Sequence, residues 1–284
     1  MNRFSVEWRE ANGQLIASEG LEDYSARSFN SIIERDPRGW TVDFSHKINK
    51  LRTGEAWDSL LDAYYRWRRP LNAADMVREL ESKGFEGIRA KYANPSDKKG
   101  WPKYVDAGHR LDLAIKQARF LQLDRRKPLR ILDIGSGAGY FLFVCKRLGH
   151  SVMGLDLDWP PMYAEMFQMM EMPRRVWRIE PFQPLPDLGA PFDFLTGFAV
   201  CFNSHGSNAV WGAKEWEFFL DDVAKNVLAE SGEIYFELNP EPSGYYTPEL
   251  AEFFRRRGGQ VEGKKVWFGK RSVPRLEGPA QKGL

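Results

Sequence analysis

The chain has 284 residues, of which 43% are hydrophobic and 28% are charged, and its formal net charge is only +2. This composition excludes wholesale disorder, and the length allows one domain with a large addition or two small domains. Because nucleic-acid binding usually shows as a strongly basic chain or face, the balanced charge makes nucleic acid an improbable partner.

The N-terminus and the cysteines indicate the cellular compartment to be expected. The first ten residues carry charges where a signal peptide would be apolar, and no apolar run approaches the length of a membrane span. We therefore expect a cytoplasmic protein with no membrane span. Cys145 and Cys201 are the only cysteines, and neither lies in a metal-ligand pair. We expect both to be reduced core thiols and expect no metal site.

Residues 1–125 are predicted to form a mainly helical N-terminal addition. Apolar residues at helical spacing predict a helix over 55–67, a second one between an N-cap at Asn72 and a stop at Gly84, and a third over about 103–123. Residues 1–54 suggest only two short strands around a turn at 36–39. The addition is either a cover that packs on the sheet edge or forms a homodimer surface, or a lid that shapes a substrate pocket. Aromatic residues at helical spacing favour the cover.

From residue 129 onward, strand and helix patterns alternate, which predicts a parallel sheet with right-handed crossovers. The predicted strands are 129–132, 151–155, 175–179, 192–200 and 233–238, and the predicted helices are 141–148, 163–170, 214–228 and 247–254. A turn at 231–232, a proline-rich loop at 181–186 and a terminal hairpin over 260–270 complete the pattern. Residues 126–271 are thus predicted to form a doubly wound, mostly parallel α/β domain, and residues 272–284 a flexible tail.

Three glycines follow the first strand of this domain at alternate positions. Gly135, Gly137 and Gly139 stand between the strand and the next helix, where a ligand could approach the backbone and meet unpaired N–H groups. Their G-x-G-x-G spacing differs from the G-x-G-x-x-G fingerprint of dinucleotide-binding proteins, so an NAD-dependent oxidoreductase is the weaker interpretation. The segment 132–139, LDIGSGAG, closely resembles the first motif of the class I S-adenosylmethionine-dependent methyltransferases.

This resemblance implies a class I methyltransferase fold, S-adenosyl-L-methionine as cofactor and S-adenosyl-L-homocysteine as product. Asp156 ends the second strand, seventeen residues after Gly139, and is assigned to the cofactor ribose, with Asp158 as the competing candidate. Asp133 would orient the glycine loop or meet the methionine amine. The predicted cofactor-binding residues are Asp133, Gly135, Ser136, Gly137, Gly139, Tyr140, Asp156, Leu157, Ile179, Glu180, Phe182 and Phe198.

Two of these assignments have alternatives on the adenine side. Either Glu180 contacts the adenine amino group, or Ile179 and Phe182 sandwich the ring through apolar contacts. Beyond the fourth strand, His205 could act as general base and Asn203 could orient the acceptor, although a lone histidine is more often structural.

The predicted activity is methyl transfer, as O- or N-methylation, to a small-molecule or glycan-type acceptor. The alternative is a non-catalytic protein that binds S-adenosylmethionine as a sensor or an assembly partner.

Overall fold

The computed structural model describes residues 8–11, 14–17, 55–94, 101–189, 191–200, 202, 210–239 and 247–269. The chain divides into two compact units, residues 1–61 and residues 62–284. In the first unit, β1 (Trp8–Ala11) pairs antiparallel with β2 (Gln14–Ala17). The helix α2 (Glu55–Arg68) begins in the first unit and ends in the second. The turn predicted at 36–39 and the predicted tail 272–284 lie outside the described residues.

The second unit opens with the helices predicted for the N-terminal addition. They are α3 (Ala73–Ser82), α4 (Phe85–Tyr92) and α5 (Ala107–Phe120), with short 3₁₀ turns at Trp101–Tyr104 and Leu123–Arg125. Asn72 caps α3 as predicted, because its Oδ1 accepts a hydrogen bond from the N–H of Ala74 at 2.8 Å. Gly84 has φ +97° and ends the first helical run, but the chain re-enters a helix at once, so α4 was missed.

A seven-stranded sheet forms the centre of this unit, in the order β5-β4-β3-β6-β7-β9-β8. Its strands are β3 (Arg130–Ile134), β4 (Ser151–Asp156), β5 (Arg174–Val176), β6 (Phe192–Val200), β7 (Leu228–Leu238), β8 (Gln260–Glu262) and β9 (Lys265–Phe268). The pairs among β3 to β7 are parallel, whereas β9 runs antiparallel to β7 and β8. The predicted doubly wound, mostly parallel sheet is confirmed. Its order reverses at β3, which lies between β4 and β6, and such a switch point is where open sheets bind ligands.

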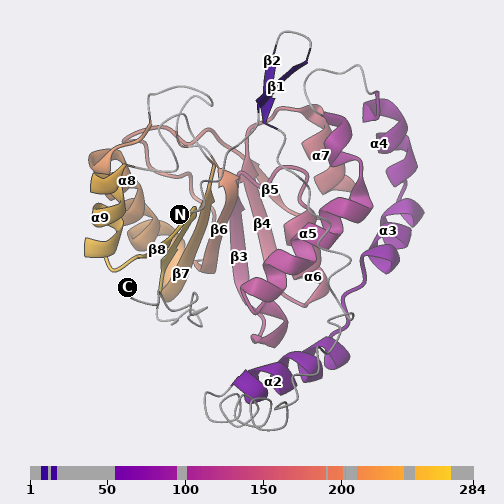
Figure 1. Cartoon of the computed structure of the whole chain (residues 1–284), viewed down its shortest axis with the longest axis horizontal. Coiled ribbons are helices and arrows are strands. Elements are labelled where there is room, and N and C mark those ends of the chain that lie inside the picture. Colours follow the sequence, from indigo (N-terminus) through magenta and orange to yellow (C-terminus); the bar gives the residue numbers. More distant parts are fainter. Residues whose placement is uncertain are drawn as a thin grey trace, which may run out of the picture. The chain divides into compact units, whose positions relative to one another are not determined.

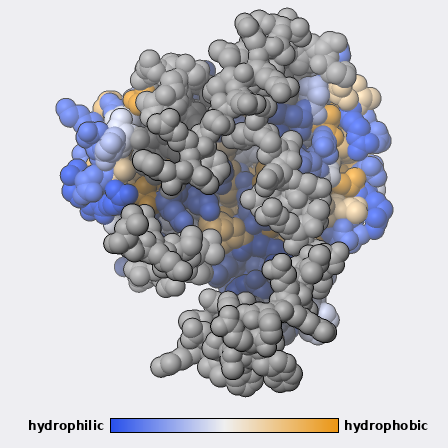
Figure 2. Space-filling model, viewed as in Figure 1, coloured by the Kyte–Doolittle hydropathy of each residue, from blue (hydrophilic) through white to orange (hydrophobic). Residues whose placement is uncertain are grey.

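Helices cover both faces of the sheet (Figure 1). The helices α5, α6 (Tyr140–Arg147) and α7 (Pro161–Met169) lie on one face, and α8 (Ala213–Asp222) and α9 (Pro248–Arg256) lie on the other. Each face has its own apolar core, one around Phe141 and Met166 and one around Trp216 and Phe254. The flank formed by α8 and α9 is mostly hydrophilic on its outer side (Figure 2). The apolar stripes of these helices therefore face the sheet.

Two predicted details of the sheet were wrong. The residues predicted as a turn, Ser231 and Gly232, lie within β7, where the register against β6 is irregular between Phe192 and Phe194. The extra residues form an irregularity in a continuous strand instead of ending it. The predicted third strand stops at Val176, so the following residues leave the sheet edge.

Candidate functional site

The glycine turn connects β3 to α6 at the carboxyl edge of the sheet. Gly135, Gly137 and Gly139 have φ values of +66°, +54° and +78°, which only glycine adopts without a steric cost. Space also requires glycine at the outer two positions. A Cβ on Gly135 would lie 2.8 Å from Cγ1 of Val200, and a Cβ on Gly139 would lie 2.7 Å from Cε2 of Phe167. The sequence motif therefore specifies a tightly packed turn.

Asp156 at the end of β4 fixes the middle of this turn. Its Oδ2 accepts a hydrogen bond from the N–H of Gly137 at 2.6 Å, and its Oδ1 accepts one from the N–H of Leu157 at 2.7 Å. Burial raises the pKa of Asp156, and the two backbone hydrogen bonds oppose this rise. Each carboxylate oxygen has two lone pairs, so each can accept one more donor. The competing candidate Asp158 is exposed instead and pairs with Arg174 at 3.1 Å.

Asp133 lies one strand away, buried at the end of β3. It stands opposite Thr196 of β6 in the parallel register, and the Thr196 hydroxyl donates to its Oδ1 at 2.7 Å. Burial raises the pKa of Asp133 to about 8, the Thr196 hydrogen bond lowers it, and the Asp156 carboxylate raises it further. Asp133 is thus a mainly protonated acid at neutral pH.

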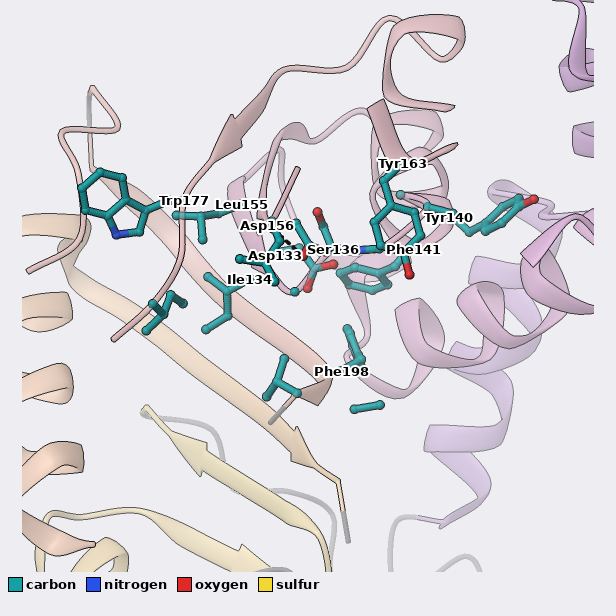
Figure 3. Close-up of a pocket in the computed structure, with 18 of the residues that line it drawn as sticks. Asp133, Ile134, Ser136, Tyr140, Phe141, Leu155, Asp156, Tyr163, Trp177 and Phe198 are labelled. Atoms are coloured by element: carbon teal, nitrogen blue, oxygen red, sulfur yellow. Dashed lines mark hydrogen bonds between the residues drawn. The ribbon is translucent and has the colours of Figure 1, made fainter. Parts of the chain in front are cut away.

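A cavity of about 810 Å³ lies over the glycine turn and the strand ends. Its size falls in the upper part of the range of small-molecule sites, roughly 300–1,000 Å³. Figure 3 shows Trp177 on one side of Asp133, Ser136 and Asp156 and Tyr163 and Tyr140 on the other. The segment after β5, residues 177–181, forms one wall of the cavity.

Two polar atoms of the cavity lining remain unsatisfied. Oγ of Ser136 and Nε1 of Trp177 are buried, and neither has a hydrogen-bond partner among the described residues. Buried polar atoms normally find a partner, and a missing one points to an absent ligand or water. Both residues line the cavity, although these two atoms themselves are buried beside it.

The opposite wall comes from the N-terminal addition and from α7. Tyr104 packs edge-on against Tyr163 with a 5.6 Å distance between ring centroids, and its carbonyl accepts a hydrogen bond from the Tyr140 hydroxyl at 2.8 Å. Burial raises the pKa of both Tyr140 and Tyr163 above the ordinary tyrosine value. These phenols stay protonated and act as hydrogen-bond donors at neutral pH. Arg110 of α5 lies over the Tyr104 ring at 4.8 Å.

Residues at the end of β6 also line the cavity, and one of them has an unusual backbone conformation. Ala199 has φ +52°, an unusual value for a residue other than glycine, and lines the cavity. The side-chain amide of Asn239 donates to the Ala199 carbonyl at 2.7 Å, and the N–H of Asn239 donates to the Val200 carbonyl at 3.2 Å. Asn239, the residue that follows β7, thus holds this bend in place.

The cavity brings together most of the residues predicted for cofactor binding. Those that line it are Asp133, Gly135, Ser136, Gly137, Gly139, Tyr140, Asp156, Leu157, Ile179, Glu180 and Phe198. Phe182 does not line it and packs instead against Phe218, with 5.9 Å between ring centroids. The predicted catalytic residues His205 and Asn203, like Cys201, lie outside the described residues. Cys145 is buried in the core.

Sequence reasoning missed many residues of the cavity lining, among them Arg110, Gln117, Tyr163 and Trp177. Trp177 could have been predicted from the sequence, because it directly follows a strand whose carboxyl end lies at the ligand-binding edge of the sheet. The described residues contain no group of three or more His, Cys, Asp or Glu side chains arranged to hold a metal ion. In the same part of the chain, no helix combines the length and the apolar character that crossing a membrane requires.

No protein-family model matches the sequence, and no curated protein matches it significantly. Among solved structures, the chain is similar to the ribosomal protein L11 methylase of Lactobacillus delbrueckii subsp. bulgaricus, with 17% identity, a TM-score of 0.36, and coverage of 57% of this chain and 78% of that one. It is also similar to a TehB-like SAM-dependent methyltransferase from Corynebacterium glutamicum, with 17% identity, a TM-score of 0.37, and coverage of 58% and 100%. The bifunctional kinase-methyltransferase WbdD is 19% identical, with a TM-score of 0.40 and coverage of 58% and 40%. These likenesses concern the fold alone.

Proposed function

We propose that the protein binds S-adenosylmethionine in this cavity and transfers its methyl group to a small-molecule or glycan-type acceptor. The observation that carries the proposal is the pairing of Asp156 with the glycine turn. The carboxylate is fixed by the N–H groups of Gly137 and Leu157, and a lone pair on each of its oxygens remains for a ligand. Two adjacent acceptors suit the two hydroxyls of a ribose.

The rest of the cavity fits the other parts of this cofactor. Trp177 and Ile179 offer apolar surface for the adenine. Ser136 offers its hydroxyl from the glycine turn. The cofactor has no phosphate group, so the site needs no phosphate-binding arrangement. This agrees with the G-x-G-x-G spacing, which differs from the fingerprint of dinucleotide-binding proteins.

The cofactor supplies an activated methyl group: the acceptor's lone pair forms the bond to carbon, the carbon–sulfur bond breaks, and its electron pair stays on sulfur. The protein's own task is to align the acceptor and exclude water. Phe141 and Phe198, whose ring centroids are 4.6 Å apart, line the cavity near the end of β6 and keep that part of it apolar. In the proposed site, His205 accepts the acceptor's proton when the acceptor is a hydroxyl, and Asn203 orients that hydroxyl.

The proposal is tested by isothermal titration of the protein with S-adenosylmethionine. The informative variant is Gly137→Ala, because a Cβ there would meet the protein only at the Tyr163 ring, 3.8 Å away, and would otherwise point at the ligand. Gly263→Ala is the matched control, since Gly263 has φ +52° in a β8–β9 turn with no atom within 4 Å of its Cβ position.

Both variants carry the same backbone strain, so equal losses of stability are expected. Affinity should fall at least about tenfold in Gly137→Ala and stay unchanged in Gly263→Ala. No binding to the wild-type protein would overturn the proposal. Binding without transfer of labelled methyl to any acceptor in a cell extract would favour the sensor or assembly protein.

A further inference from the structure

Arg110 is the one cation of the cavity lining that has no carboxylate bound to it among the described residues. Its only hydrogen bond there runs from Nε to the Lys103 carbonyl at 3.0 Å. The other charges are accounted for. Arg178 lies 4.0 Å from Glu180, Asp156 accepts two backbone N–H groups, and Asp133 is held protonated by burial.

The surroundings of Arg110 orient its guanidinium group. The bond from Nε and the stacking over the Tyr104 ring at 4.8 Å fix the plane of the group, while its two terminal NH₂ groups carry no bond to the described residues. A planar fork of two free NH₂ groups matches a carboxylate or a phosphate, which it binds through two parallel hydrogen bonds.

The same face of α5 continues into the cavity from this cation. Leu113, Ala114 and Gln117 follow Arg110 at spacings of three, four and seven residues and line the cavity with it. Seven residues of helix span about 10 Å. The wall therefore presents a cation at one end, an amide at the other and apolar side chains between them.

The cavity lining also includes a pair of aromatic rings. Phe141 lies in the first turn of α6 and Phe198 near the end of β6, and their ring centroids are 4.6 Å apart. Both line the cavity. A cavity lined by Leu113, Ala114 and these two rings thus suits a flat apolar body.

We propose that the α5 wall is the acceptor subsite, and that the acceptor is a small molecule with an apolar, ring-sized body and a carboxylate or phosphate group bound by Arg110. The proposal rests on the proposed function and names the substrate class of the same site. A neutral glycan would leave Arg110 unpaired and would bring polar hydroxyls against Leu113 and the phenylalanine rings, so the wall favours an anionic ring compound over it.

The test compares two probes with the same hydroxyphenyl ring, 4-hydroxybenzoate, which carries a carboxylate, and 4-hydroxybenzyl alcohol, which carries a neutral hydroxymethyl group in its place. Each is titrated into the protein saturated with S-adenosylhomocysteine, whose own binding is measured first. The wild-type protein should bind the benzoate at least about tenfold more tightly than the alcohol, as one charge-assisted pair implies. This comparison needs no variant and alone can overturn the proposal, if the alcohol binds equally well.

Variants then assign the preference to Arg110. Arg110→Gln should abolish it while leaving the affinity for S-adenosylhomocysteine within about twofold, and Arg110→Lys should keep part of it because the charge remains. Lys103→Gln is the matched control. Lys103 also lies over the Tyr104 ring, at 4.9 Å, but does not line the cavity, so the preference should persist.

Two results with these variants would overturn the proposal. One is a benzoate preference that survives in Arg110→Gln. The other is an equal loss of S-adenosylhomocysteine affinity, which would assign the guanidinium to the carboxylate of the cofactor. Failure of the wild-type protein to bind S-adenosylhomocysteine would instead be a failure of the proposed function, and the first titration detects it separately.

Discussion

Asp133 ties the stability of the protein to pH. Its pKa in the folded state is about 8, chiefly through burial, whereas an aspartate in an unfolded chain titrates near 3.9. Between these values the folded protein keeps a proton that the unfolded chain has lost. The unfolded state binds fewer protons, so the free energy of unfolding should fall as the pH rises, by up to about 1.4 kcal/mol per pH unit from this group.

The substitution Asp133→Asn removes this titration and keeps an oxygen that can accept the Thr196 hydroxyl. Both proteins are unfolded with urea between pH 5 and 7. The free energy of unfolding of the variant should rise relative to that of the wild type as the pH rises. Since every other group titrates in both proteins, the difference isolates Asp133. Two parallel stability curves would show that the carboxyl is ionised in the folded state.

Gly154 shows a second residue-level constraint, this time one of space. It pairs with Asp133 across β3 and β4, and a Cβ would lie 2.5 Å from Cζ of Phe167 and 2.7 Å from Oγ of Ser136. Gly154→Ala should therefore lower the free energy of unfolding by about 1–3 kcal/mol, as overpacking does. The control Gly87→Ala, in α4 with open space, should raise it by up to about 1 kcal/mol. Chemical denaturation measures the free energy of unfolding of both variants. If the two substitutions changed it in the same direction, the packing argument would be contradicted.

At the scale of residues, the sequence could predict the site only where the backbone itself carries the signal. The glycine spacing and the acid ending the next strand follow from local geometry, so Gly137 and Asp156 were placed together correctly. Arg110 and Trp177 could not be found in this way. Their roles depend on which face of a helix and which side of a loop meet the cavity, and that depends on packing between distant segments.

At the scale of elements, the loop after β5 is positioned by α8 on the far face of the sheet. Asp222 is buried at the end of α8, where its Oδ2 accepts the N–H of Leu185 at 2.8 Å and its Oδ1 accepts the side-chain amide of Asn226 at 2.7 Å. The same loop carries Trp177 and Ile179 into the cavity. Asp222 therefore acts as a positioning residue for the wall proposed to hold the adenine.

The substitution Asp222→Ala leaves the Leu185 N–H buried without a partner, which should lower the free energy of unfolding by about 1–3 kcal/mol. Affinity for S-adenosylmethionine should also fall several-fold, because the wall loosens. Asp221→Ala is the matched control, since its neighbouring carboxylate is exposed and pairs with Arg257 at the surface, where an ion pair contributes about 0–1 kcal/mol. Titration calorimetry of both variants would contradict the positioning role if Asp222→Ala bound the cofactor as tightly as Asp221→Ala does.

Element types could be predicted from the sequence better than element ends. The stripe of Leu111, Ala114, Ile115 and Ala118 predicts α5, and all four are buried. Its ends are 3₁₀ turns, which share the same spacing over a few residues and so cannot be separated by pattern alone. The error at Ser231 has a similar cause, because residues typical of turns also occur in bulged strands.

At the scale of the whole molecule, one apolar core joins the predicted addition to the sheet. Met76, Leu80 and Phe85 from α3 and α4 are fully or almost fully buried in the same cluster as Met162 and Met166 of α7. The boundary predicted at residue 125 separates two roles in sequence, but this core crosses it. The helices of the addition thus serve both as a cover and, through α5, as part of the cavity wall.

This continuity predicts how the chain responds to truncation. Removing a single buried leucine, methionine or phenylalanine side chain from a core typically costs about 2–5 kcal/mol, whereas a whole domain is stable by only about 5–15 kcal/mol. A chain of residues 126–284 would lose every core side chain of α3, α4 and α5 at once, so it should show no cooperative unfolding transition. A chain of residues 55–284 keeps all of them and should unfold cooperatively and bind S-adenosylmethionine as tightly as the full chain. Thermal unfolding and titration calorimetry on the two chains measure cooperativity and affinity. A cooperative transition in the shorter chain would contradict the prediction. It would mean that the sheet and its remaining helices form a core that is stable without the addition.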